Sequence, residues 1–202
     1  DRYRRERNDF YKDMKSVISI HNIEFQGKFN PYLLGSLFGL GNDYLGALKF
    51  DHDINLLKGA IQLADRVNTV SENYANELLN PYFSFGLDPI LSSERGKLRG
   101  IVNGINYDKF DPSSDPNISQ KFSLKSLNKK IKNKLAFQKE MALEVSEDIP
   151  MVGMVTRLTG QKGIDLVVGA AEHILNMGAQ LVILGTGDPY FEDQLRNLEN
   201  RR

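Results

Sequence analysis

Residues 151–189, MVGMVTRLTGQKGIDLVVGAAEHILNMGAQLVILGTGDP, decide the fold class because the spacing of their apolar residues changes along the stretch. Two short apolar runs, 151–156 and 180–184, predict buried strands. Gly178 is a natural end for a helix between them. That helix, residues 163–177, has an apolar face at helical spacing made of Ile164, Val167, Val168, Ala171 and Leu175. A strand, a helix and a strand in this order predict a parallel sheet of the α/β class.

The same alternation of strands and helices extends upstream. Short runs rich in β-branched residues predict strands at 15–23, 66–70 and 98–102. Apolar residues at helical spacing predict a helix over residues 54–64. Ser71 predicts the N-cap of a further helix, because its hydroxyl can accept a hydrogen bond from a free backbone amide of the first turn.

Two stretches interrupt this pattern. Residues 26–53 are rich in glycine, proline and aromatic residues, which predicts an irregular region that faces a ligand. The prolines and serines of DPSSDP, residues 111–116, are typical of a linker, so we expect a domain boundary between residues 1–112 and residues 113–202. The chain starts at Asp1 and ends inside a helical pattern, and we therefore expect it to be a piece of a longer protein.

The composition of the 202 residues excludes several classes of function. Twenty-six basic and 26 acidic side chains cancel, so nothing favours nucleic acid or a membrane as a partner. The lysines of a predicted helix over 124–143 are most simply a solvated face. The absence of cysteine excludes disulfides and thiolate chemistry. No apolar run reaches membrane-spanning length, and no feature of the sequence indicates an oligomeric state.

Arg157 and Lys162 are the strongest candidates for a binding site. They flank the turn between the strand at 151–156 and the following helix, where the first backbone amides of the helix have no acceptor of their own. Gly163 allows a ligand to approach the backbone closely. Two cations at such a turn predict a cradle for a phosphate or a diphosphate. The alternative is a solvated turn whose charges merely flank a glycine.

Other polar residues follow predicted strands. His21 ends the first strand and could transfer a proton, bind a metal, contact a sugar or have a purely structural role. A metal is disfavoured because the remaining histidines, His52 and His173, lie in distant segments without ligand spacing. Asn103 begins an Asn-Gly pair that is either a turn or a site residue. Gly185 and Gly187 of GTGD are weak evidence for a ligand-facing turn.

Five segments in order resemble the central part of bacterial glycogen synthases and plastid starch synthases. They are HNIEFQG at 21–27, LLKGAIQLADRVNTVS at 56–71, GIVNGINYDKFDP at 100–112, RLTGQKGIDLV at 157–167 and LVILGTGDP at 181–189. The resemblance implies a GT-B type glycosyltransferase with two Rossmann-like domains facing across a cleft. Residues 1–112 would be the C-terminal part of the first domain, and residues 113–202 the N-terminal part of the second, nucleotide-binding domain.

The resemblance also implies a reaction and residue roles. The family transfers glucose from ADP-glucose to the non-reducing end of an α-1,4-glucan with retention and needs no metal or other cofactor. Arg157 and Lys162 match its diphosphate-binding pair, His21 the histidine beside the donor glucose, and Asn103 the asparagine of its cleft. Gly163, Gly185 and Gly187 are expected at the nucleotide site. A bacterial cytoplasm is the expected compartment, and a plastid is the alternative.

Parts of the family's active site have no counterpart in these residues. The Lys-x-Gly-Gly-Leu loop is absent, and so is the later loop with a glutamate near the donor sugar. We therefore expect this chain alone to be inactive. Two other functions stay open. One is a retaining glycosyltransferase that uses UDP-glucose and a small sugar acceptor. The other is a non-catalytic nucleotide- or glucan-binding module, which the absence of tryptophan disfavours.

Overall fold

The computed structural model describes residues 9–201, and the chain divides into two compact units, Asp1–Ile105 and Asn106–Arg202. Residues 1–8 and 202, at the outer ends of the two predicted domains, lie outside the described residues. The division precedes the DPSSDP stretch, because an exposed coil at residues 101–106 already separates the last strand of the first unit from the second unit.

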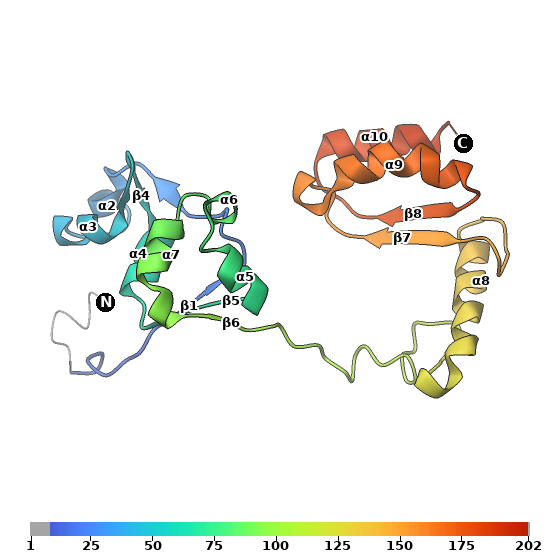
Figure 1. The fold of residues 1–202 in the computed structure, drawn as a ribbon, viewed down its shortest axis with the longest axis horizontal. Helices are drawn as coiled ribbons and strands as arrows, with labels where there is room; N and C mark the ends of the chain where they lie inside the picture. Colours follow the sequence, from blue (N-terminus) through green and yellow to red (C-terminus); the bar gives the residue numbers. More distant parts are fainter. Residues whose placement is uncertain (1–8, 202) are drawn as a thin grey trace. The chain divides into compact units, whose positions relative to one another are not determined.

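The first unit contains a parallel sheet of three strands (Figure 1). It consists of β1 (Val17–Ile20), β5 (Arg66–Thr69) and β6 (Leu98–Gly100), with β5 in the middle. The three predicted strands are confirmed, although each is shorter than predicted. All three strands therefore present their carboxyl ends, where open α/β sheets bind ligands, at one edge.

Helices pack against this sheet around an apolar core. They are α4 (Leu56–Leu63), α5 (Glu72–Glu77), α6 (Pro81–Ser84), α7 (Asp88–Ser93) and the 3-10 turn η2 (Arg95–Lys97). As predicted, the Ser71 side chain caps α5 by accepting a hydrogen bond from the Tyr74 amide. Figure 1 shows the helices α4, α5, α6 and α7 above the sheet, with α4 and α7 side by side. The buried core consists of Ile20, Ile23, Ile61, Val67, Leu78, Leu87, Leu91 and Leu98.

The stretch 26–53, predicted to be irregular, contains short regular elements. The strands β2 (Lys28–Phe29), β4 (Asp53–Asn55) and β3 (Lys49–Phe50) form a small antiparallel sheet in that order. The helical turns beside it are α2 (Leu33–Ser36), η1 (Asn42–Tyr44) and α3 (Leu45–Leu48). Because Ile54 belongs to β4, the helix predicted from residue 54 begins at Leu56 instead.

Lys58 of α4 is buried against the helical turn α3 beside the small sheet. Its Nζ donates hydrogen bonds to the carbonyl oxygens of Gly46 and Ala47, at 3.0 and 2.8 Å, and to Oε1 of Gln62 at 3.0 Å. These bonds join α4 to the carbonyl end of α3, whose last carbonyls have no partner within that helix. Burial lowers the pKa of Lys58 from its ordinary value of 10.5.

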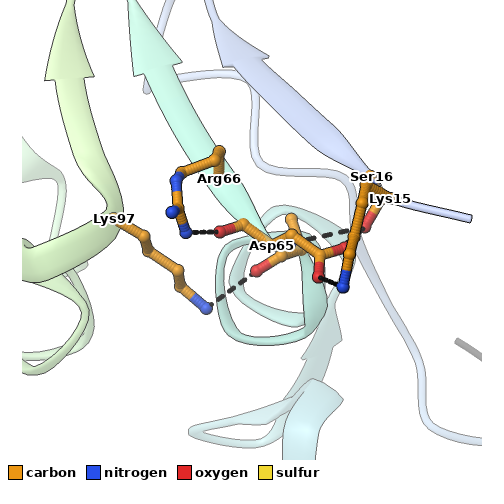
Figure 2. Close-up of polar contacts among 6 residues, drawn as sticks. Lys15, Ser16, Asp65, Arg66 and Lys97 are labelled. Atoms are coloured by element: carbon orange, nitrogen blue, oxygen red, sulfur yellow. Dashed lines mark hydrogen bonds and ion pairs between the residues drawn. The ribbon is translucent and has the colours of Figure 1, made fainter. Parts of the chain in front are cut away.

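Polar contacts clamp the amino ends of the three parallel strands (Figure 2). The Ser16 amide and hydroxyl donate to Oδ2 of Asp65, at 2.8 and 3.1 Å, and Lys15 Nζ lies 3.6 Å from Oδ1 of the same carboxylate. Lys97 Nζ donates to the carbonyl oxygen of Ala64 at 3.0 Å. These contacts tie the chain before β1 and the turn before β6 to the turn that enters β5. The fold is thus secured at the edge opposite to the strands' carboxyl ends.

The second unit begins with η3 (Leu124–Lys130) and α8 (Ile131–Glu140). The structure has two elements where a single helix over 124–143 was predicted: a 3-10 segment that is kinked at Ser126, whose backbone angles are non-helical, and the helix α8. Ala142, with a φ of 55°, follows the end of α8. The central part is β7 (Met151–Val155), η4 (Gly160–Lys162), α9 (Ile164–Asn176) and β8 (Gln180–Leu184), followed by α10 (Pro189–Glu199).

Strands β7 and β8 are parallel, with Met151 opposite Gln180 and Val155 opposite Leu184. Figure 1 shows α9 and α10 on one side of the two strands. The predicted strand, helix and strand are therefore confirmed. The last residues of the two strands are apolar and exposed to solvent, with Val155 81% and Leu184 68% exposed.

Candidate functional site

The loops that follow β7 and β8 pair with each other. We call residues 156–163 the β7 loop and residues 185–188 the β8 loop. The Leu158 amide donates to the carbonyl oxygen of Thr186 at 2.9 Å, and the Asp188 amide donates to the carbonyl oxygen of Leu158 at 2.8 Å. Leu158 itself is buried. The parallel pairing of the strands thus continues into the loops and holds the β7 loop in a defined place.

Arg157 and Lys162 are exposed on this loop. Within residues 9–201, neither side chain forms a hydrogen bond or an ion pair. The Lys162 amide donates to the Thr159 carbonyl oxygen at 2.9 Å and the Gly163 amide to that of Gly160 at 2.9 Å, so internal bonds shape the turn. The fold therefore holds the backbone of the loop and leaves both cations available to an external anion.

Gly163 is required by the backbone of the turn that leads into α9. Its φ of 67° lies in the left-handed region, which other residues adopt only with strain. Helix α9 starts at the next residue, so its first-turn amides point into the region beside the β7 loop. These amides carry the positive end of the helix dipole, which favours an anion.

Gly185 and Gly187 allow the two loops to lie against each other. A Cβ atom at Gly185 would collide with the Thr156 carbonyl oxygen, and one at Gly187 would collide with that of Leu158. The Gly187 amide donates to Oε1 of Glu192 at 2.9 Å. The structure thus gives both glycines a packing role, and Gly187 uses its amide inside the protein. Direct contact of these two glycines with a nucleotide stays a prediction.

The β7 loop also contains a polar atom that the sequence did not single out. The Thr159 hydroxyl oxygen is buried and has no hydrogen-bond partner among the described residues. The position of this threonine between the two cations was the only signal in the sequence.

His21 lies at the carboxyl end of β1 and is exposed. Across residues 9–201, its imidazole takes part in no hydrogen bond or ion pair. Asn103 follows β6, and its side chain is exposed in a coil rather than placed in a turn. The Ile101 amide still donates to the Thr69 carbonyl oxygen at 2.8 Å, so the coil leaves the sheet after this point. His21 and Asn103 therefore follow two strands of one sheet at the same edge.

The candidate residues fall into two groups, one in each unit. His21 and Asn103 belong to the first unit, and Arg157, Lys162, Gly163, Gly185 and Gly187 belong to the second. No group of three or more histidine, aspartate and glutamate side chains that could hold a metal is present within residues 9–201. Nor does any helix in that range have the length and hydrophobicity to cross a membrane.

Comparison with known proteins places these observations in a family context. Residues 2–93 match the starch synthase catalytic domain family. The glycogen synthase of Clostridium perfringens is 47% identical over 195 residues, which are 96% of this chain and 40% of that protein. The glycogen synthase of Streptococcus mutans is 49% identical over 185 residues, 91% of this chain and 39% of that protein. The chain thus spans about 40% of the length of these curated relatives.

A solved structure shows the same similarity. The catalytic domain of starch synthase IV from Arabidopsis thaliana, bound to ADP and acarbose, matches with a TM-score of 0.85 and 32% sequence identity. The match covers 95% of this chain and 42% of that domain. The predicted resemblance to glycogen and starch synthases, and the α/β fold of GT-B type that it implies, are therefore confirmed.

Proposed function

We propose that this relative of glycogen and starch synthases is the central part of an ADP-glucose-dependent glucosyltransferase, which lengthens an α-1,4-glucan at its non-reducing end with retention. One observation carries the proposal. Two exposed cations, Arg157 and Lys162, lie without internal partners among the described residues on a firmly held loop at the N-terminus of a helix. The similar starch synthase IV domain was solved with ADP, a diphosphate anion of the kind this loop is suited to bind.

The proposed reaction gives the two cations their role. Transfer breaks the bond between C1 of the donor glucose and the diphosphate oxygen, and the bonding electrons stay with the departing ADP. The 4-hydroxyl oxygen of the acceptor's terminal glucose forms the new bond to C1 and releases its proton. Arg157 and Lys162, together with the first amides of α9, stabilise the charge that develops on the departing ADP. Because these groups are already in place, no reorganisation is needed at the moment of bond cleavage. The neutralisation that they supply is of the kind that a metal ion provides in other transferases.

The first unit supplies the proposed sugar-binding residues. We assign His21 to the side of the donor glucose and Asn103 to the cleft, since both follow strands of the sheet β1-β5-β6 at its carboxyl edge. Gly163, Gly185 and Gly187 shape the nucleotide site by setting the path of the two loops.

The donor assay tests this proposal on the full-length protein that contains the chain. We expect incorporation of labelled glucose from ADP-glucose into a glucan primer, and little incorporation from UDP-glucose at the same concentration. Equal use of both donors would remove the basis for a glycogen or starch synthase and favour the UDP-glucose enzyme. No transfer from either donor would favour a binding module.

The chain of 202 residues by itself is proposed to be inactive. A transferase of this type aligns donor and acceptor between two domains, and most of its rate comes from that alignment and from charge stabilisation. Appreciable glucose incorporation by the purified chain would show that the catalytic residues have been misplaced.

A further inference from the structure

The position of His21 depends on the loop that carries it. We call residues 21–27 the His21 loop. The imidazole is exposed and has no polar partner in the described part of the chain, so no hydrogen bond or ion pair orients it. Its place is therefore set by the backbone of the loop, and the groups that hold this backbone determine where the imidazole can lie.

The first half of the loop is held from strand β5 and helix α5. The Thr69 hydroxyl donates to the carbonyl oxygen of Ile20 at 2.7 Å, directly before His21. The Ile23 amide donates to the hydroxyl oxygen of Tyr74 at 3.2 Å. The Ile23 side chain is only 1% exposed and belongs to the main core. Both chain neighbours of the His21–Asn22 pair are thus fixed.

The second half is held by the buried side chain of Gln26, which is 4% exposed. Its Nε2 donates to the Phe85 carbonyl oxygen at 3.1 Å, and its Oε1 accepts a hydrogen bond from Nδ2 of Asn55 at 2.7 Å. Asn55 in turn caps α4 by accepting from the Lys58 amide. The Leu56 and Leu57 amides also donate to the carbonyl oxygens of Gly27 and Gln26, both at 3.0 Å, so backbone and side chain together tie the His21 loop to the start of α4. The Gln26 side chain adds the tie to the corner after α6.

This network favours a defined geometry over extra stability. A buried amide must satisfy its polar atoms or lose free energy, and an apolar side chain of similar volume would carry no such requirement. The two hydrogen bonds are directional, and they accept only one placement of the loop relative to α4 and Phe85. The backbone that these two hydrogen bonds hold belongs to the loop that carries His21.

We propose that Gln26 is a positioning residue for His21, with Tyr74 as the second anchor of the same loop. The inference rests on the proposed place of His21 beside the donor glucose. Gln26 itself touches no substrate. It keeps the imidazole within the narrow range of positions that sugar transfer requires, and displacements near 1 Å can cost roughly 100-fold in rate.

The test is a double-mutant cycle in the full-length protein, with ADP-glucose and a saturating glucan primer. We expect His21→Ala to lower kcat strongly and Gln26→Leu to lower it by roughly 10- to 100-fold, with KM for the glucan little changed. In the His21→Ala background, Gln26→Leu should cause no further loss, because the residue through which it acts is gone.

Gln138→Leu is the matched control. Gln138 is also fully buried, with Nε2 bonded to Oε1 of Gln180 at 2.8 Å and Oε1 accepting from the Ser146 amide at 3.1 Å. Its partner Gln180 is the first residue of β8 and lies opposite Met151, at the amino ends of the strands, whereas Arg157 and Lys162 follow the carboxyl end of β7. This variant should lower the melting temperature and leave kcat unchanged, which separates lost stability from lost positioning. If Gln26→Leu does not fold, Tyr74→Phe replaces it, since that change removes only the hydroxyl group.

The outcomes separate this inference from the proposed function. An unchanged kcat in His21→Ala would overturn the proposed role of His21, and the positioning role with it. A strong effect of His21→Ala combined with an unchanged kcat in folded Gln26→Leu would overturn the positioning role alone. Losses that multiply in the double mutant would do the same, because they would show that Gln26 acts independently of His21.

Discussion

Arg157→Ala tests whether the β7 loop serves chemistry rather than folding. The side chain is exposed and forms no hydrogen bond or ion pair with the described residues. Its removal should therefore change the free energy of unfolding by no more than about 0.5 kcal/mol, as is usual for such surface positions. In the proposed reaction the guanidinium stabilises charge on the leaving ADP, and loss of one such group costs about 2–4 kcal/mol, or roughly 30- to 1000-fold in kcat.

The assay measures initial rates of glucose transfer from ADP-glucose to a saturating glucan primer in the full-length protein. A thermal melt of the same preparations shows whether the variants are folded. Lys162→Ala should behave in the same way, whereas Lys132→Ala, an exposed cation of α8, should match the unmodified protein in both measurements. An unchanged kcat in Arg157→Ala would refute its role in leaving-group stabilisation. A large loss of stability would contradict the assignment of Arg157 as a side chain without internal partners.

Three further predictions concern the framework of the site. Gly187→Ala places a Cβ against the Leu158 carbonyl oxygen, so it should lower the free energy of unfolding by about 1–3 kcal/mol and should also lower the rate of glucose transfer. Gly169→Ala is the control, because its Cβ meets open space in α9, and it should change neither quantity. Asp65→Ala removes the acceptor of the exposed Ser16 amide and hydroxyl and should lower stability by about 0.5–1.5 kcal/mol in urea unfolding. Burial lowers the pKa of Lys58 in the folded protein, so between this lowered pKa and 10.5 the unfolded chain binds more protons than the folded protein. The free energy of unfolding should therefore rise with pH in this range. Lys58→Met should abolish the rise, which thermal melts across the range would measure.

The strongly patterned segments of the chain could be predicted from the sequence. The strand at 180–184 has the predicted bounds, and the helix after Gly163 ends before Gly178 as expected. Ser71 caps its helix because a serine before a helical pattern supplies the missing acceptor locally. Such features depend on interactions within a few residues, and the sequence displays them directly.

Features that depend on distant contacts could not be predicted. The small antiparallel sheet has strands of two or three residues, which are too short to show a period, and the helical spacing from Ile54 onward therefore predicts a helix that starts two residues too early. Gln26 resembled an ordinary loop residue because its partners Asn55 and Phe85 lie 29 and 59 positions away. The packing role of Gly185 and Gly187 was hidden for the same reason, since it arises only when the β7 and β8 loops meet.

The linkage formed in the product is the most direct test of the proposed activity. A maltooligosaccharide incubated with ADP-glucose and the full-length protein can be followed by proton NMR, which distinguishes anomeric configurations and the two ends of the acceptor. We predict new α-1,4-linked glucose at the non-reducing end, with retention of the donor configuration. A β-linked product, or no extension of the acceptor by a folded and complete protein, would contradict the proposed activity.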